Sequence, residues 1–120
     1  MEIKYLTTEE VVAIHDEIIK SSGGHTGMIN LSNLDFVVSQ VEIPKNFVRK
    51  AATLFFGILI SHPFVDGNKR TALESMNAFI RLNGKRFVSD NEETWNRLHQ
   101  VSEGKLKFEE ALQWIRGNIK

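Results

Sequence analysis

The sequence predicts an all-α fold: a single domain over residues 1–120, a helical bundle of roughly six helices. Three observations predict it. Every long segment with periodic apolar residues repeats at helical spacing, not in the alternating pattern of strands. Capping residues, glycines and prolines separate these segments where helices would begin and end. The 120 residues, 42% hydrophobic and 25% charged, suffice for one globular domain with its own core.

The first expected helix covers residues 7–20. It opens with Thr7-x-x-Glu10, the spacing of a capping box, and apolar residues then recur every three or four positions. The stretch SSGGHTGM ends it, because three glycines between residues 22 and 27 favour a flexible loop. Ser32 can cap a second helix that continues to about Ser39.

A third helix is expected to have Pro44 at its first position, where proline is favoured. Its apolar face is wide, which predicts a central, buried helix; the face consists of Phe47, Val48, Ala51, Leu54, Phe55, Ile58 and Leu59. Pro63 disfavours a helical conformation for His62, so this helix should end near Ser61.

The rest of the chain predicts three more helices. One is expected to have Asn68 as its N-cap and to end at Asn83-Gly84. The piece KRFVS that follows is at most short and extended. Asp90 and Glu93 have the spacing of a helix cap, and the apolar positions of that helix are Trp95, Leu98 and Val101. A last amphipathic helix follows Gly104 and carries Phe108, Leu112, Ile115 and Ile119.

Composition excludes several classes of protein. The chain has no cysteine, which excludes disulfide scaffolds and thiolate zinc sites. The longest apolar run, AATLFFGILI, is shorter than the about 18 residues of a membrane span. The acidic start MEIKYLTTEE does not resemble a signal peptide. We therefore expect a cytoplasmic protein with no membrane partner.

Charge is unevenly distributed along the chain. The formal net charge is zero, which argues against direct binding of nucleic acid. Residues 45–86 nevertheless hold eight Lys or Arg and only two acidic residues. Such a segment either solvates helix faces or attracts an anionic ligand.

The loop HPFVDGNKR, residues 62–70, carries more chemistry than a turn between helices needs. The first turn of the helix after it exposes backbone N–H groups that can bind an anion. Gly67 allows close approach to that backbone, and Lys69 and Arg70 add two positive charges. These residues together predict a phosphate site, although the motifs GxxxxGK[ST], HRD and DFG are absent.

Three further residues of the loop complete this chemistry. Asp66 suits a Mg²⁺ ligand, since Mg²⁺ is commonly held by one carboxylate together with water and phosphate oxygens. His62 suits a general base, because histidine exchanges protons near neutral pH. Phe64 is expected to anchor the loop in the core. Taken singly each residue has an ordinary structural explanation; together they point to phosphoryl or nucleotidyl transfer to a hydroxyl group.

The same loop resembles the signature of the Fic/Doc family, HxFx(D/E)GNxxR. The segments YLTTEEVVAIHDEII, GGHTGM and NKRTAL extend the resemblance over most of residues 5–84, toward the short death-on-curing (Doc) toxins of that family. The resemblance implies an all-α fold whose motif loop enters a central helix. It also implies roles for single residues: His62 as general base, Asp66 as Mg²⁺ ligand, Phe64 as core anchor, and Gly67, Asn68 and Arg70 as phosphate-binding elements.

Two positions depart from the adenylylating members of the family. Lys69 stands where they have glycine, and Leu73 where they have a second arginine. The death-on-curing branch shows a similar pattern. It implies an ATP- and Mg²⁺-dependent kinase that transfers the γ-phosphoryl group to a Ser or Thr hydroxyl of a translation elongation factor. Adenylyl transfer, and a non-catalytic module that binds a nucleotide or a partner, are the alternatives.

The resemblance also bears on regulation. Many family members carry a self-inhibitory [S/T]xxxE[G/N] segment, and the nearest candidates here fail at Thr94 and at His99. A separate antitoxin chain is therefore the expected partner. The loop at residues 22–30 either docks the target or antitoxin or serves as a flexible connection. His15 is expected to be structural, like His99, and His25 has no assigned role.

Overall fold

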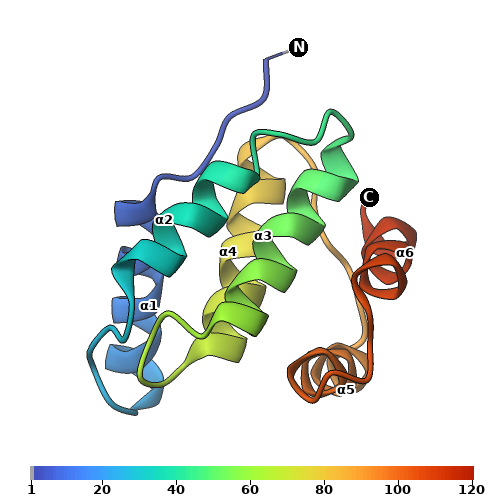
Figure 1. Cartoon of the computed structure of the whole chain (residues 1–120). Coiled ribbons are helices and arrows are strands. Elements are labelled where there is room, and N and C mark those ends of the chain that lie inside the picture. The colour runs from blue at the N-terminus through green and yellow to red at the C-terminus, as the bar shows by residue number, and fades with distance from the viewer. Residues whose placement is uncertain (1) are drawn as a thin grey trace.

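The computed structural model describes residues 2–120 and consists of six helices (Figure 1). They are α1 (Thr8–Ser22), α2 (Leu31–Gln40), α3 (Phe47–Ser61), α4 (Asn68–Leu82), α5 (Asn91–Ser102) and α6 (Phe108–Asn118). Between residues 2 and 120 the only β-structure is two isolated bridges. The predicted all-α fold is confirmed. None of the helices in this range has the length and apolarity to cross a bilayer.

The central pair of helices is α3 and α4, as Figure 1 shows, with α1 and α2 on one side and α5 and α6 on the other. α3 contacts α2, α4, α5 and α6, and its residues Phe55 and Ile58 are completely buried. Buried residues of all six helices join one hydrophobic core, with Val11, Leu34, Met76, Leu98 and Leu112 among them. The prediction of a central third helix is therefore confirmed.

Helix starts depend on caps, and the starts predicted from the sequence for α2 and α3 were wrong. Asn30 rather than Ser32 caps α2, accepting a hydrogen bond from Asn33 N–H at 3.1 Å. α3 begins after Asn46, whose side chain accepts from Arg49 N–H at 3.0 Å, so Pro44 lies in the preceding connection. In both places the side chain of a nearby asparagine accepts a hydrogen bond from a first-turn N–H group.

The caps predicted for α1 and α5 are confirmed. Thr7 and Glu10 form the reciprocal capping box of α1, in which each side chain bonds the backbone of the other residue. Asp90 accepts from Glu93 N–H at 3.0 Å at the start of α5. These caps fix the two helices that flank the candidate site.

Both outer segments of the chain are tied to the connection between α4 and α5. Asn83 is buried, and its side chain donates to Lys4 C=O and accepts from Lys4 N–H, each at 2.9 Å. Phe87 and Ile119 form an antiparallel bridge, flanked by hydrogen bonds that join residues 86–88 to residues 118–120. The short extended piece KRFVS is therefore present.

Candidate active site at the loop between α3 and α4

His62 begins the loop in an unusual backbone conformation. Its φ of 46° and ψ of 61° are left-handed, and it is the only non-glycine residue in the described range 2–120 with positive φ. Its N–H still bonds Ile58 C=O at 3.2 Å, which closes α3 at Ser61 as predicted. Such a conformation costs on the order of 1–3 kcal/mol and is typical of functional sites.

Asn68 closes the loop on itself. Its amide donates to Phe64 C=O at 2.9 Å, and its Oδ1 accepts from Phe64 N–H at 3.1 Å. The prediction that Asn68 is the N-cap of α4 was therefore wrong. Gly67 occupies that position with φ of 79°, and no side chain caps the helix. Because the Asn68 amide bonds the loop, first-turn N–H groups of α4 have no side-chain partner and can donate hydrogen bonds to an anion.

His15 of α1 supports the loop from the core side. Its side chain is buried, and its ring stacks on Phe64 with the centroids 3.8 Å and the planes 5° apart. Its Nε2 lies 2.8 Å from the backbone oxygen of Asp66. Since a carbonyl only accepts, this contact places a proton on Nε2. His15 is buried, consistent with the structural role expected from the sequence, but its stacking partner Phe64 and its hydrogen-bonding partner Asp66 are both residues of the loop.

Asp66 presents an ionised carboxylate at the same place. Its Oδ2 accepts from His25 N–H at 3.2 Å and its Oδ1 from Gly67 N–H at 2.8 Å. These two hydrogen bonds, His25 first, lower the pKa of Asp66 below its ordinary value of 3.8. The side chain is exposed, so the remaining lone pairs face solvent.

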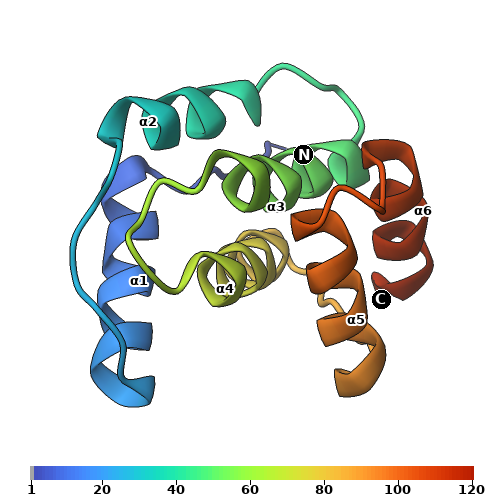
Figure 2. The ribbon, with the colours of Figure 1, turned by 60° about the horizontal axis from the view of Figure 1, so that its bottom comes forward.

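The glycine-rich loop at residues 22–30 runs alongside the loop between α3 and α4 (Figure 2). Ile29 N–H donates to Pro63 C=O at 2.8 Å and Val65 N–H to Gly27 C=O at 3.1 Å. A Cβ added at Gly24 would lie 2.8 Å from Asp66 Oδ2. Glycine at this position therefore lets the backbone approach the carboxylate, and the segment is hydrogen-bonded to the loop along its length.

Most of the predicted site residues line one pocket of about 290 Å³. Its lining consists of His62, Val65, Asp66, Gly67, Asn68, Lys69, Arg70 and Trp95. Phe64 lies beneath it, 1% exposed. The sequence placed Trp95 among the apolar positions of α5 and not among the site residues, but the structure places it at the pocket.

The residues of the pocket fit a Mg²⁺ ion shared with a ligand. Among residues 2–120 no three His, Asp or Glu side chains gather to hold a metal by themselves. Asp66 alone offers an exposed, ionised carboxylate next to Lys69 and Arg70. A single carboxylate is how proteins hold Mg²⁺ when phosphate oxygens and water complete its shell.

Comparison with known proteins identifies the loop. The sequence model of the Fic/DOC family matches residues 5–80, well over half of the chain, including all of residues 62–70. The chain belongs to the Fic/DOC family. It is also similar to "Protein kinase doc" of Escherichia phage P1, with 27% identity over 120 residues, which cover 95% of this chain and 94% of that protein.

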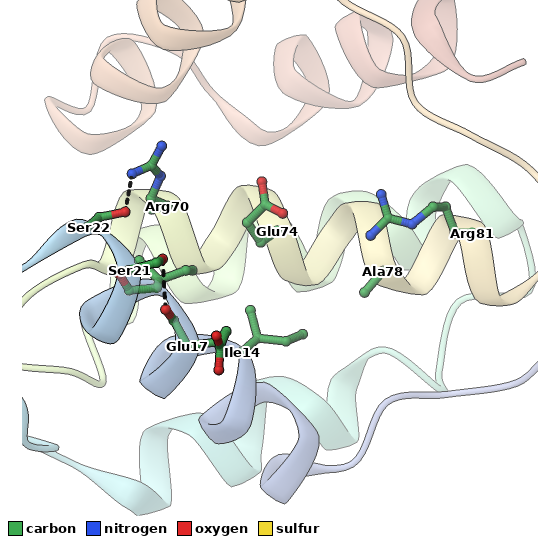
Figure 3. Close-up of a pocket in the computed structure, with 9 residues that line it drawn as sticks. Ile14, Glu17, Ser21, Ser22, Arg70, Glu74, Ala78 and Arg81 are labelled. Carbon is green, nitrogen blue, oxygen red and sulfur yellow. Dashed lines mark hydrogen bonds between the residues drawn. The ribbon is translucent and has the colours of Figure 1, made fainter.

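A second concavity, the α1–α4 groove, adjoins this Fic/DOC loop. It has a volume of about 380 Å³, and Figure 3 shows its lining residues: Ile14, Glu17, Ile18, Ser21, Ser22, Arg70, Glu74, Ala78 and Arg81. Arg70 donates from Nη1 to Ser22 Oγ at 2.8 Å. Arg70 therefore lines both the groove and the pocket of the Fic/DOC loop.

Proposed function

We propose that this chain is a Doc-type protein kinase, which transfers the γ-phosphoryl group of ATP to a Ser or Thr hydroxyl of a protein target. The observation that carries the proposal is the pocket that combines His62, the ionised Asp66 and two cations at an uncapped helix start. Similarity to "Protein kinase doc" supports kinase chemistry. The resemblance to death-on-curing toxins supports a translation elongation factor as target and a role as a cytoplasmic toxin controlled by an antitoxin.

The proposed phosphate-binding element is the start of α4. The N–H groups of its first turn, the Lys69 ammonium and the Arg70 guanidinium all offer donors to phosphate oxygens. Asp66 and the phosphate oxygens together would hold Mg²⁺, which supplies charge neutralisation on the transferred group. The hydrogen bonds from His25 and Gly67 keep the carboxylate ionised and oriented.

His62 activates the target hydroxyl. Its side chain is exposed, and within residues 2–120 no group hydrogen-bonds its imidazole, so an incoming hydroxyl has access to it. The imidazole takes the hydroxyl proton as the oxygen forms a bond to the γ-phosphorus. The bond from that phosphorus to the β–γ bridging oxygen breaks, and ADP leaves. His62 then releases the proton to solvent.

Lys69 and Leu73 favour γ-transfer over adenylyl transfer. Lys69 lines the pocket at the position where adenylylating relatives have glycine, and its long side chain is expected to obstruct the close approach of an α-phosphate there. Leu73 packs against the core and supplies no second cation. The nucleotide is therefore expected to present its terminal phosphate to His62.

The test is transfer of label from ATP to a candidate target, with ATP radiolabelled at either the α or the γ phosphate. We expect label only from the γ position, and a loss of at least about 100-fold in His62→Ala with nucleotide affinity nearly unchanged. Lys69→Gly should lower γ-transfer.

Label retained only from the α position would instead assign adenylyl transfer. A His62→Ala chain that still arrests growth would favour the non-catalytic alternative.

The α1–α4 groove is the proposed docking place of an antitoxin helix. Its position against Arg70 would let a bound chain reach a phosphate-binding residue. The groove presents cations and carboxylates on the same face: Arg70, Arg81, Glu17 and Glu74. This mixed charge suits a partner helix that carries both signs.

A further inference from the structure

Trp95 occupies a position that core packing does not explain. Its neighbours on α5, Leu98 and Val101, are 0% and 2% exposed, whereas Trp95 is 36% exposed and lies outside the hydrophobic core. The second tryptophan, Trp114, is 7% exposed and packs against Phe55 and Phe87. Trp95 therefore presents part of its indole to the pocket rather than to the core.

The surroundings of Trp95 indicate what kind of ligand that is. Among the residues that line the pocket, Trp95 alone comes from α5; all the others belong to residues 62–70. The Arg70 guanidinium carbon lies 5.9 Å from the centre of the Trp95 ring system, within the range of a cation–π contact. One face of the pocket is therefore a flat aromatic surface, and the adjacent face is cationic.

We propose that Trp95 is the platform on which the purine base of the nucleotide stacks, while Lys69 and Arg70 bind the phosphates. The inference rests on the proposed function, since it takes ATP as the ligand of this pocket. A nucleotide is complementary to both faces of the pocket, because its planar base matches the indole and its anionic phosphates match the two cations. Indole offers the largest aromatic face of any side chain, and Trp95 is the one aromatic ring besides the His62 imidazole among the residues that line the pocket.

A role for Trp95 in docking the antitoxin or the target fits less well. Trp95 does not line the α1–α4 groove, and it faces the residues that bind phosphate. A weaker alternative is that Trp95 only positions Arg70 through the cation–π contact. The two roles differ in one measurable respect: positioning Arg70 affects every phosphate ligand equally, whereas stacking affects only ligands that carry a base.

The experiment compares ATP with inorganic triphosphate, each with Mg²⁺ and without target protein. Affinities are measured by calorimetry for the unmodified chain, Trp95→Ala and Trp95→Phe, after circular dichroism has established that each variant is folded. We expect Trp95→Ala to weaken ATP binding roughly 10- to 100-fold while triphosphate binding changes less than about 3-fold. Trp95→Phe, which retains an aromatic face, should keep most of the preference for ATP.

Fluorescence gives a second readout, because the chain contains only two tryptophans. ATP should quench the emission of Trp114→Phe, in which Trp95 is the remaining tryptophan, and should leave the emission of Trp95→Phe unchanged. Equal losses for ATP and triphosphate in Trp95→Ala would overturn the stacking role, as would unchanged ATP affinity. In those cases ATP still binds the unmodified chain and the kinase proposal stands. Failure of the unmodified chain to bind ATP would overturn both.

Discussion

Among single residues, His15 combines two contacts that hold the loop between α3 and α4. Its ring supports Phe64, and its Nε2–H bonds the backbone oxygen of Asp66, the residue whose carboxylate would hold Mg²⁺. The loop residues around it were recognisable from the sequence because they are contiguous. His15 and Trp95 were not, because they approach the loop from α1 and α5, and only tertiary packing brings them there.

His15→Phe separates the two contacts, because phenylalanine keeps a stacking ring and loses the donor. We expect kcat to fall about 10-fold and the Mg²⁺ concentration that gives half-maximal activity to rise. The free energy of unfolding should fall by only about 1 kcal/mol, the net contribution of one hydrogen bond. His15→Gln, which keeps a donor, should recover part of kcat while losing more stability. Steady-state kinetics at varied Mg²⁺ and urea denaturation measure these effects. Unchanged kinetics in His15→Phe would limit His15 to packing.

Asp66 makes stability depend on pH in a defined direction. Hydrogen bonds from His25 and Gly67 lower its pKa in the folded chain, so its ionised form stabilises the fold above the ordinary value of 3.8. That contribution is lost as pH falls through the lowered pKa. In chelator-treated protein, Asp66→Asn should therefore be less stable than the unmodified chain at neutral pH, and the difference should shrink in acid well below 3.8. Denaturant midpoints measured across this range test it; a difference independent of pH would contradict it.

At the scale of elements, α2 and α3 pack closely enough to require a glycine. A Cβ added at Gly57 of α3 would lie 2.7 Å from Val37 Cγ1 of α2, and Val37 is buried and β-branched, so it cannot move aside. We expect Gly57→Ala to lower the free energy of unfolding by about 1–3 kcal/mol, as overpacking does. Denaturant unfolding measures the change.

Gly117 of α6 provides the matched control, because an added Cβ there meets no atom within 4 Å. Gly117→Ala should raise stability by about 0.5–1 kcal/mol through helix propensity alone. If both substitutions shift stability in the same direction, the close contact between α2 and α3 is not the cause.

The elements themselves were largely predictable, because apolar periodicity fixes each helix independently of its neighbours. The first residue of each helix was harder to predict. Asn30 and Asn46 each compete with a nearby residue that could also begin a helix, Ser32 and Pro44, and local spacing does not rank them. Asn68 failed as a predicted cap for a different reason: its amide reaches back to Phe64, a contact that depends on the path of the loop.

For the whole molecule, the α1–α4 groove and the pocket at the loop between α3 and α4 are two concavities that share one lining residue, Arg70. Ala78 lines the groove and lies outside the pocket. We expect Ala78→Trp to weaken binding of the antitoxin at least about 10-fold while kinase activity stays near that of the unmodified chain. Calorimetric titration with the antitoxin, beside the labelling assay, measures both.

Gln113 serves as a control position for that substitution, because it is exposed on α6 and lines neither concavity. Gln113→Trp should leave antitoxin affinity and activity unchanged. If Ala78→Trp lowers activity and antitoxin affinity together, the groove is not separable from the catalytic site. Full antitoxin binding by Ala78→Trp would place the docking surface elsewhere.

Arg70 lines both the α1–α4 groove and the pocket. Its guanidinium donates to Ser22 of α1 and lies over the ring of Trp95 of α5. One guanidinium cannot serve a phosphate and a groove-bound side chain equally at the same time. An occupant of the groove that engages Arg70 and a nucleotide in the pocket therefore weaken each other by the same factor, since coupling between two binding sites is reciprocal. Silencing the enzyme would then depend on how much nucleotide surrounds it as well as on how much inhibitor is present.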